Sequence, residues 1–82
     1  MSEAMTPTEE LVMEVLAGRY RTGEAIWTFS RRQRPVMRRL EARGWVFFKE
    51  GIVEDTLLVG LTEAGKAEVL SPTYIPPFER TP

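Results

Sequence analysis

Two residue types that proteins often use for chemistry are missing from this 82-residue chain: it contains no cysteine and no histidine. Without cysteine, the chain has no disulfide framework, no thiolate zinc site and no cysteine nucleophile. Without histidine, it lacks the commonest metal ligand and the commonest general base. We therefore expect a protein that is not an enzyme and that holds neither a metal ion nor a cofactor.

Long hydrophobic runs are missing too. The longest apolar segments, residues 45–48 and 57–61, are far shorter than the roughly 20 residues that span a bilayer. The first ten residues, MSEAMTPTEE, lack the basic and apolar regions of a secretory signal. These absences predict a cytoplasmic protein with no membrane partner. The length and the 43% hydrophobic content predict one small domain, near the size at which stability is marginal without a partner.

The net charge is small, −1, but it hides a strong segregation along the chain. Between positions 19 and 43, eight arginines and two glutamates leave a net charge of +6, whereas three cations and ten acids leave the rest at −7. Arginines three or four apart on a helix repel by about 0.2 to 0.5 kcal/mol per pair, so something outside the helix should compensate the stretch SRRQRPVMRRLEARGWV. The segregation predicts a basic face for a polyanionic partner, with a solvated charged helix as the alternative.

The segment TPTEELVMEVLAG carries the signals of a helix start. Thr6 is placed to cap the helix, Pro7 to fill its first position, and Glu9 to complete a capping box. Gly18 is the expected stop. Four apolar residues are expected to form the buried face of this helix: Leu11, Val12, Val15 and Leu16.

A second, brief helix is expected after a short extended link. Thr22 is placed to cap it, and it would run over residues 24–28. Three residues are expected to give this helix its buried side: Ala25, Ile26 and Phe29.

The arginine-rich stretch is expected to form a third helix. Ser30 and Gln33 repeat the capping spacing and predict a helix over residues 31–43 that ends at Gly44. Pro35 would then occupy about the fifth helical position, which predicts either a distorted first turn or a later start. Three apolar positions are expected to face the core: Val36, Met37 and Leu40.

After residue 44 the pattern changes to that of a β-hairpin. The β-branched and aromatic runs WVFFK and TLLVGL flank the loop EGIVED and predict two antiparallel strands. Thr62 is placed to cap a short last helix, EAGKAEVL, before the proline-rich extended tail, residues 71–82. Two apolar residues are expected on the outer face of the hairpin: Phe47 and Leu58.

The run VMRRLEARGWV, followed after the hairpin by LTEAGKAEVL, resembles winged-helix transcription regulators of the MarR and PadR types. The resemblance covers roughly residues 8–70. It implies an α+β fold, a small winged helix-turn-helix domain over residues 1–70 with three helices, a β-hairpin wing and a short C-terminal helix. It also implies that the third helix enters the major groove of DNA and that residues 50–55 form the wing tip. The long terminal helices that build the family's dimers and ligand pocket are missing, so no small-molecule effector is expected.

Helical geometry sorts the basic residues independently of any family, because each residue turns the helix by about 100°. Four residues point nearly opposite the core and are expected to read bases, through guanine or a thymine methyl group: Arg31, Arg34, Pro35 and Arg38. Three arginines lie on one flank and are expected to meet phosphates: Arg32, Arg39 and Arg43. Ser30 and Lys49 complete the predicted DNA-binding set.

Two functions remain open at this point. The first is a sequence-specific binder of double-stranded DNA, such as a small transcriptional regulator or a phage-type repressor or accessory factor. The alternative is a winged-helix protein-interaction module, favoured by the acidic loop KEGIVED, by surplus apolar surface and by the proline-rich tail. A homodimer is expected on DNA, and the tail is expected either to contribute to its contact or to pack on its own domain. Five apolar residues are available for these contacts: Trp27, Phe47, Tyr74, Ile75 and Phe78.

Overall fold

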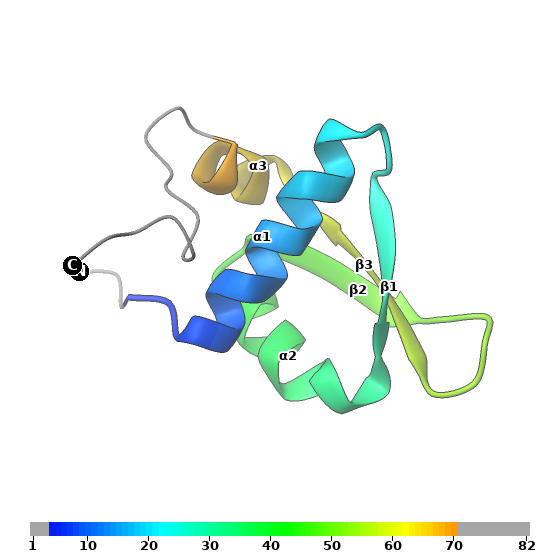
Figure 1. The fold of residues 1–82 in the computed structure, drawn as a ribbon. Helices are drawn as coiled ribbons and strands as arrows, with labels where there is room; N and C mark the ends of the chain where they lie inside the picture. The colour runs from blue at the N-terminus through cyan, green and yellow to red at the C-terminus, as the bar shows by residue number, and fades with distance from the viewer. Residues whose placement is uncertain (1–3, 71–82) are drawn as a thin grey trace.

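The computed structural model describes residues 4–70 of the chain, and the predicted tail, residues 71–82, lies outside the described residues. The described residues form an α+β domain with three α-helices and a three-stranded antiparallel sheet (Figure 1). A 3-10 turn, η1, joins the first strand to the second α-helix. The elements follow in the order α1 (Pro7–Arg21), β1 (Ile26–Ser30), η1 (Arg31–Gln33), α2 (Arg34–Ala42), β2 (Val46–Glu50), β3 (Thr56–Leu61) and α3 (Glu63–Val69).

The sheet has the strand order β1-β3-β2, so β3 lies in the middle and pairs with both neighbours. In this register Val59 lies between Trp27 and Phe48. Side chains alternate between the two faces of a strand, so the buried Leu57, Val59 and Val46 point to the core face. The outer face carries Ile26 together with Phe47 and Leu58, which confirms the expected placement of the last two residues.

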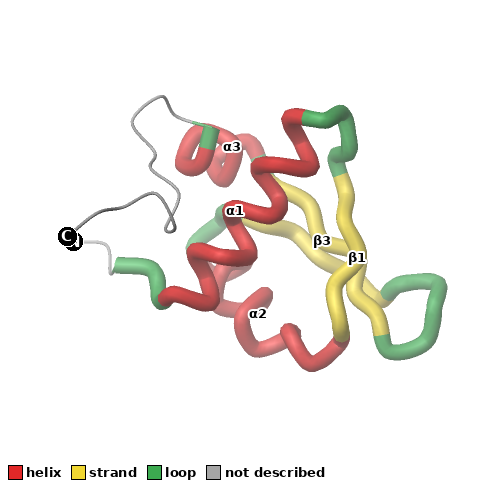
Figure 2. The backbone as a smooth tube through the Cα atoms, in the orientation of Figure 1, coloured by secondary structure: helices red, strands yellow, loops and turns green. Residues whose placement is uncertain are grey.

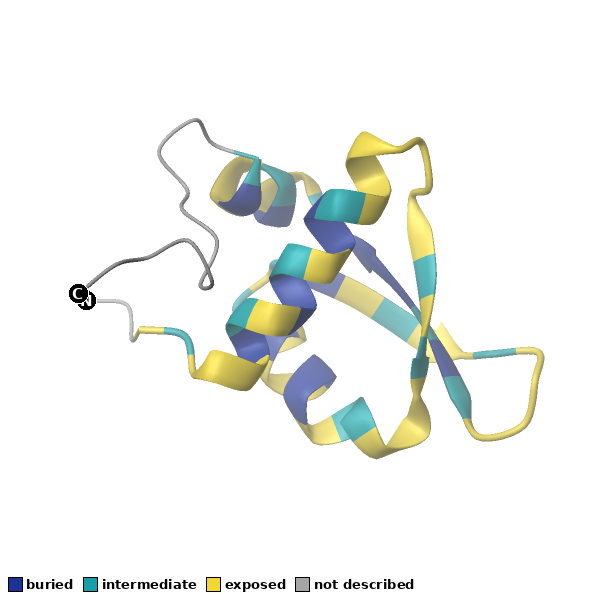
Figure 3. Cartoon of the chain, in the orientation of Figure 1, coloured by how far each residue is buried: buried dark blue, intermediate teal, exposed yellow. Residues whose placement is uncertain are grey.

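The three helices cover the core face of the sheet. α1 crosses in front of the strands and turns one buried stripe toward them (Figure 3). α2 contributes Val36, Met37 and Leu40 to the core, as its sequence predicts, and α3 contributes Val69. The predicted face of α1 is partly wrong, because Leu11 and Val15 are exposed. The buried stripe instead follows the spacing i, i+3/4, i+7/8 from Glu9: Glu9, Val12, Met13, Leu16 and Ala17.

The start of α1 is confirmed and its predicted end is wrong. Thr6 caps the helix, and its hydroxyl accepts a hydrogen bond from the Glu9 N–H at 3.2 Å. The helix continues past Gly18 to Arg21. It ends where the Thr22 hydroxyl donates to the Arg19 carbonyl, at 2.8 Å, and Gly23 takes a φ of +93°. A left-handed backbone of this kind is easy only for glycine, so the second glycine, and not the first, ends the helix.

The predicted second helix, residues 24–28, is wrong, because β1 occupies this position. Thr22 caps the end of α1 and begins no helix. The strand alternates between exposed and half-buried residues, with Trp27 and Phe29 directed to the core and Ile26 exposed. Pairing with β3 along its whole length stabilises the extended form of this β-branched and aromatic segment. A single α-helix, preceded by η1, therefore lies between β1 and β2, and the expected pair of α-helices is not formed.

The arginine-rich helix begins later than its first arginine. Residues 31–33 form η1, where the Ser30 hydroxyl accepts a hydrogen bond from the Arg32 N–H at 3.2 Å. α2 starts at Arg34, which places Pro35 in the first turn, where its missing N–H costs nothing. The predicted end is confirmed, since Gly44 has a φ of +79° and its N–H donates to the Glu41 carbonyl at 2.8 Å.

The hairpin of β2 and β3 and the short helix α3 are confirmed. Thr62 caps α3, and its hydroxyl accepts from the Gly65 N–H at 3.0 Å. The same hydroxyl donates to the Gly44 carbonyl at 2.5 Å, which ties the start of α3 to the end of α2. Among the described helices, none combines the length and the apolar character needed to cross a bilayer.

Candidate nucleic-acid interface

The basic surface of the domain is built by η1 and α2. η1 carries Arg31 and Arg32, and α2 carries Arg34, Arg38 and Arg39. Arg43 caps the C-terminal end of α2. Since Val36, Met37 and Leu40 fix one side of α2 in the core, the helix presents a polar side to solvent.

Glu50, the last residue of β2, neutralises one end of this surface. It forms an ion pair with Arg34, and its Oε1 lies 4.0 Å from the Nε of Arg31. The Arg31 N–H also donates to the carbonyl of Asp55 at 2.9 Å. These contacts fix the hairpin against η1 and the first turn of α2. The sequence placed Glu50 in an acidic wing tip, whereas in the structure its exposed carboxylate pairs with arginines of the same domain.

Glu9 neutralises the other end. Its side chain is only 2% exposed, and its Oε1 accepts a hydrogen bond from the Thr6 N–H at 2.7 Å. The Nε of Arg39 lies 3.5 Å from Oε2, and the Nη2 of Arg43 lies 3.7 Å from Oε1. Burial raises the pKa of Glu9, but the hydrogen bonds with Thr6 and the charges of Arg43 and Arg39 outweigh it and hold that pKa below its usual value. The carboxylate therefore stays charged between the two arginines.

Within the described residues, these two glutamates offset part of the repulsion among the closely spaced arginines. Four of the six arginines between positions 31 and 43 lie near Glu9 or Glu50. The other two, Arg32 and Arg38, have no ion-pair partner among residues 4–70. Six arginines against Glu9, Glu50 and the exposed Glu41 leave this surface a net charge of +3.

The predicted DNA-binding residues do not all share one surface. Arg39 and Arg43 lie on one flank as expected, because both contact Glu9. Arg32 lies on η1, before α2 begins, and forms no ion pair with Glu9 in the described structure. Lys49 is an exposed residue of β2 next to Glu50, and neighbouring residues of a strand point to opposite faces. Lys49 therefore lies on the outer face of the sheet, away from the arginines.

Sequence reasoning missed the structural role of the two glutamates. The capping box located Glu9 but gave no sign of its contacts with α2. Glu50 differs in no local respect from the other acids of the loop. Only the packing of α1 and of the hairpin against α2 brings these carboxylates to the guanidinium groups.

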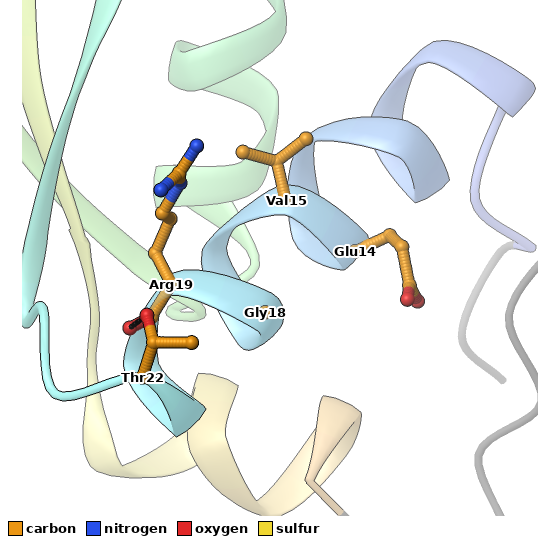
Figure 4. A pocket seen from close by; sticks show the side chains of 5 residues that line it. All are labelled: Glu14, Val15, Gly18, Arg19 and Thr22. Carbon is orange, nitrogen blue, oxygen red and sulfur yellow. Dashed lines mark hydrogen bonds between the residues drawn. The ribbon is translucent and has the colours of Figure 1, made fainter.

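Among the hollows of the described residues, two lie along α1. The larger, about 320 Å³, is lined by Glu14, Val15, Gly18, Arg19 and Thr22. Figure 4 shows the Arg19 side chain on the same side of the helix as Val15, with Glu14 pointing away from both. The guanidinium group of Arg19 already has two partners at this hollow. Its carbon lies 3.6 Å from the centre of the Trp27 ring, and its Nη1 lies 3.4 Å from Glu24 Oε1. The smaller hollow, about 180 Å³, has a largely apolar wall. No group of three residues able to hold a metal ion occurs within the described part of the chain.

No protein-family model, curated protein or solved structure matches the chain. The resemblance to winged-helix regulators therefore stays a prediction from the sequence motifs.

Proposed function

We propose that the chain binds double-stranded DNA through η1 and α2, as a small transcriptional regulator or a phage-type repressor or accessory factor. The observation that carries this proposal is that Arg32 and Arg38 remain unpaired among the described residues although the neighbouring arginines are held by Glu9 and Glu50. Two arginines that have no ion-pair partner among residues 4–70 and that lie on η1 and α2 suit a polyanionic partner.

In this proposal Arg38 and Pro35 contact bases, whereas Arg32 contacts a phosphate. Arg38 lies in the middle of α2 and is exposed, so two of its guanidinium N–H donors are available to the O6 and N7 atoms of a guanine in the major groove. The exposed ring of Pro35, one turn earlier, is available to a thymine methyl group. Arg32 on η1 is available to a phosphate, which supplies affinity without reading sequence.

The held arginines and the order of the elements also support the proposal. Arg34 and Arg39 keep partly exposed side chains, so they add to the positive potential while Glu50 and Glu9 fix their positions. A helix, a strand, a helix and a hairpin, with the strand order β1-β3-β2, is compatible with a small winged-helix-like arrangement. Here β1 replaces the first helix of the helix-turn-helix pair, so α2 would enter the groove supported by the sheet and α1.

The test compares Arg38→Ala and Arg32→Ala with a charge-matched control, Arg21→Ala. Arg21 is exposed at the end of α1, and its Nη2 lies 3.4 Å from the carbonyl of Val69, away from α2. Binding to a duplex selected from a random pool, and to unselected duplex, is measured by fluorescence anisotropy at 50 and 200 mM salt, concentrations over which phosphate contacts weaken strongly.

We expect Arg38→Ala to cost about 1 to 3 kcal/mol on the selected duplex and to reduce its preference over random DNA. Arg32→Ala should weaken binding to both duplexes and lower the salt slope by about one unit. Arg21→Ala should change neither. Binding that is absent at low salt, or that Arg21→Ala weakens as much as the other two variants, would refute the proposal.

A second candidate function is a protein-interaction module. It is favoured by the hairpin loop, where Ile52 and Val53 are among the most exposed large apolar residues described. Such a module binds without steep salt dependence and is insensitive to Arg38→Ala, which separates it from DNA binding in the same experiment.

A further inference from the structure

The strand β1 forms one edge of the sheet. It pairs with β3 along its whole length, and within residues 4–70 no strand pairs with its other side. In Figure 2 the strand connects the turn after α1 to the helical segment that begins with η1. The backbone groups on the open side of β1 therefore have no strand to bond to in a single copy of the described domain.

The register shows which residues carry these open groups. In an antiparallel pair, residues that exchange hydrogen bonds with the partner strand alternate with residues whose N–H and C=O groups point away from it. The Arg31 N–H donates to the Asp55 carbonyl at 2.9 Å, one step beyond the last pair of the register between β1 and β3. Arg31 is thus a bonded position, and so are Phe29 and Trp27. The N–H and C=O groups of three residues point to the open side: Ile26, Thr28 and Ser30.

The sequence of β1 lacks the features that usually protect an edge. Natural edge strands are commonly blunted by charged residues, by proline or by a bulge. The segment IWTFS contains neither a charge nor a proline, and its pairing with β3 is continuous. The other edge strand, β2, carries Lys49 and Glu50 instead. Since β-branched and aromatic residues favour strand pairing, β1 is suited to accept another strand.

An apolar hollow borders the same edge. The hollow of about 180 Å³ lies between α1 and β1, and its wall includes Leu11 and Val15 of α1 and Phe29 of β1. Leu11 is 56% exposed and Val15, one helical turn later, is 39% exposed. Because β1 is the outermost strand beside this hollow, a partner that pairs with the open edge would also cover these two side chains.

We propose that β1 pairs with β1 of a second copy, antiparallel and centred on Thr28, so that two domains share one continuous sheet. In this register Thr28 faces Thr28 of the other copy, and Ile26 faces Ser30. All three residues carry open backbone groups, so the contact gains up to about six backbone hydrogen bonds. Trp27 then lies opposite Phe29, and this aromatic pair adds to the contact.

A second copy suits this edge better than the chain's own tail does. The twofold axis of such a pair is perpendicular to the sheet, so both α1 helices lie on the same face and the two apolar hollows adjoin across the paired strands. Each copy offers the same patch, as a closed dimer requires. In the tail, residues 71–82, four of the twelve residues are proline, which donates no backbone hydrogen bond. The contact needs no DNA and does not rest on the proposed function.

The absence of cysteine from the chain permits a test of the register. Full-length Thr28→Cys and Ile26→Cys chains, each with one thiol, are oxidised mildly at equal concentration. Opposite residues of a bonded pair have Cα atoms about 5.5 Å apart, within the range of a disulfide. Ile26 lies on the same face of the same strand, but four residue steps, about 13 Å along the strand, separate it from Ile26 of the second copy. The Ile26→Cys chain is therefore a matched control.

We expect the Thr28→Cys chains to join several times faster than the Ile26→Cys chains, and to lose that advantage in urea. Equal rates, or a faster rate for Ile26→Cys, would overturn the proposal. So would the absence of a Thr28→Cys disulfide dimer above the urea baseline, which is the result if the tail occupies the edge.

Sedimentation equilibrium of the unmodified full chain, without DNA and up to millimolar concentration, tests the same contact without a cross-link. Thr28→Lys places two like charges directly opposite each other, and Leu11→Lys places a charge at the apolar border. Each should raise the dimer dissociation constant about tenfold or more. Val53→Lys, in the hairpin loop, is the charge-matched control and should leave this constant unchanged.

All three substituted side chains are exposed, so each variant should fold. A chain that stays monomeric would overturn the proposal, and so would a dimer that Thr28→Lys leaves unchanged or that Val53→Lys weakens as much as the other two variants.

Discussion

Replacing Glu9 by glutamine tests whether the buried carboxylate stabilises the domain through its charge. Glutamine keeps the side-chain length, and its amide oxygen can still accept from the Thr6 N–H, which now lies 2.7 Å from Oε1. The change removes the attraction to Arg39 and Arg43, at 3.5 and 3.7 Å, and the interaction of a negative charge with the start of α1.

We expect Glu9→Gln to lower the free energy of unfolding by about 1 to 2 kcal/mol at pH 7. The helix dipole accounts for about 0.3 to 1 kcal/mol of this loss. Arg39 adds less than about 1 kcal/mol, because its side chain is 51% exposed and its charge is screened by solvent. Arg43 is only 18% exposed and is screened less, so it adds up to about 1 kcal/mol. Relief from burying a charge offsets part of the loss.

The effect should depend on pH with a definite sign. The pKa of Glu9 is lower in the folded chain than its ordinary value of 4.5, so the unfolded chain binds the proton more tightly. The stabilisation is therefore complete above about pH 4.5 and is lost as the pH falls through the folded pKa. The difference between the natural chain and Glu9→Gln should be constant from pH 7 to about pH 5 and should shrink at pH 3.

Urea unfolding followed by the fluorescence of Trp27 and Trp45, both packed against the core, measures this difference. The control is Glu63→Gln, which removes a first-turn glutamate of α3 that is 92% exposed and should change stability by less than about 0.5 kcal/mol. The reasoning is refuted if Glu9→Gln is as stable as the natural chain at pH 7, or if its deficit is the same at pH 3.

Two further predictions concern Glu50 and two glycines. Glu50→Gln should raise the affinity for DNA and steepen its salt dependence by up to about two units, because it releases two arginines to phosphates; a large loss in an anisotropy titration would mean that the carboxylate positions the interface. Gly65→Ala should cost about 1 to 3 kcal/mol or more, because a Cβ there overlaps the Trp45 carbonyl and would lie 2.8 Å from its carbon. Gly18→Ala, with nothing within 4 Å of the added carbon, should instead stabilise α1 by about 0.5 to 1 kcal/mol. Thermal melts should therefore show a lower melting temperature for Gly65→Ala and a higher one for Gly18→Ala, and a shift in the same direction for both variants would contradict the prediction.

The elements that the sequence predicts correctly are those whose signals lie within one turn or one pair of strands. Thr6 and Glu9 define the start of α1 through a capping box, Gly44 ends α2, and Thr62 starts α3. The alternation of apolar residues around the loop defines the hairpin and places Phe47 on its outer face. Each of these signals acts through neighbours that are close in the chain, so no knowledge of distant segments is needed.

The elements that only the tertiary structure decides depend on partners far away in the chain. Residues 26–30 become a strand because β3 offers them a complete hydrogen-bonded edge, and local capping signals give way to that pairing. Among residues 4–70, some arginines of η1 and α2 are paired with a carboxylate and others are not, because Glu9 comes from α1 and Glu50 from β2, 16 positions beyond Arg34. Charge attraction depends on distance in space, which the packed core sets, so the sequence specifies the number of arginines but not which of them remain available to a partner.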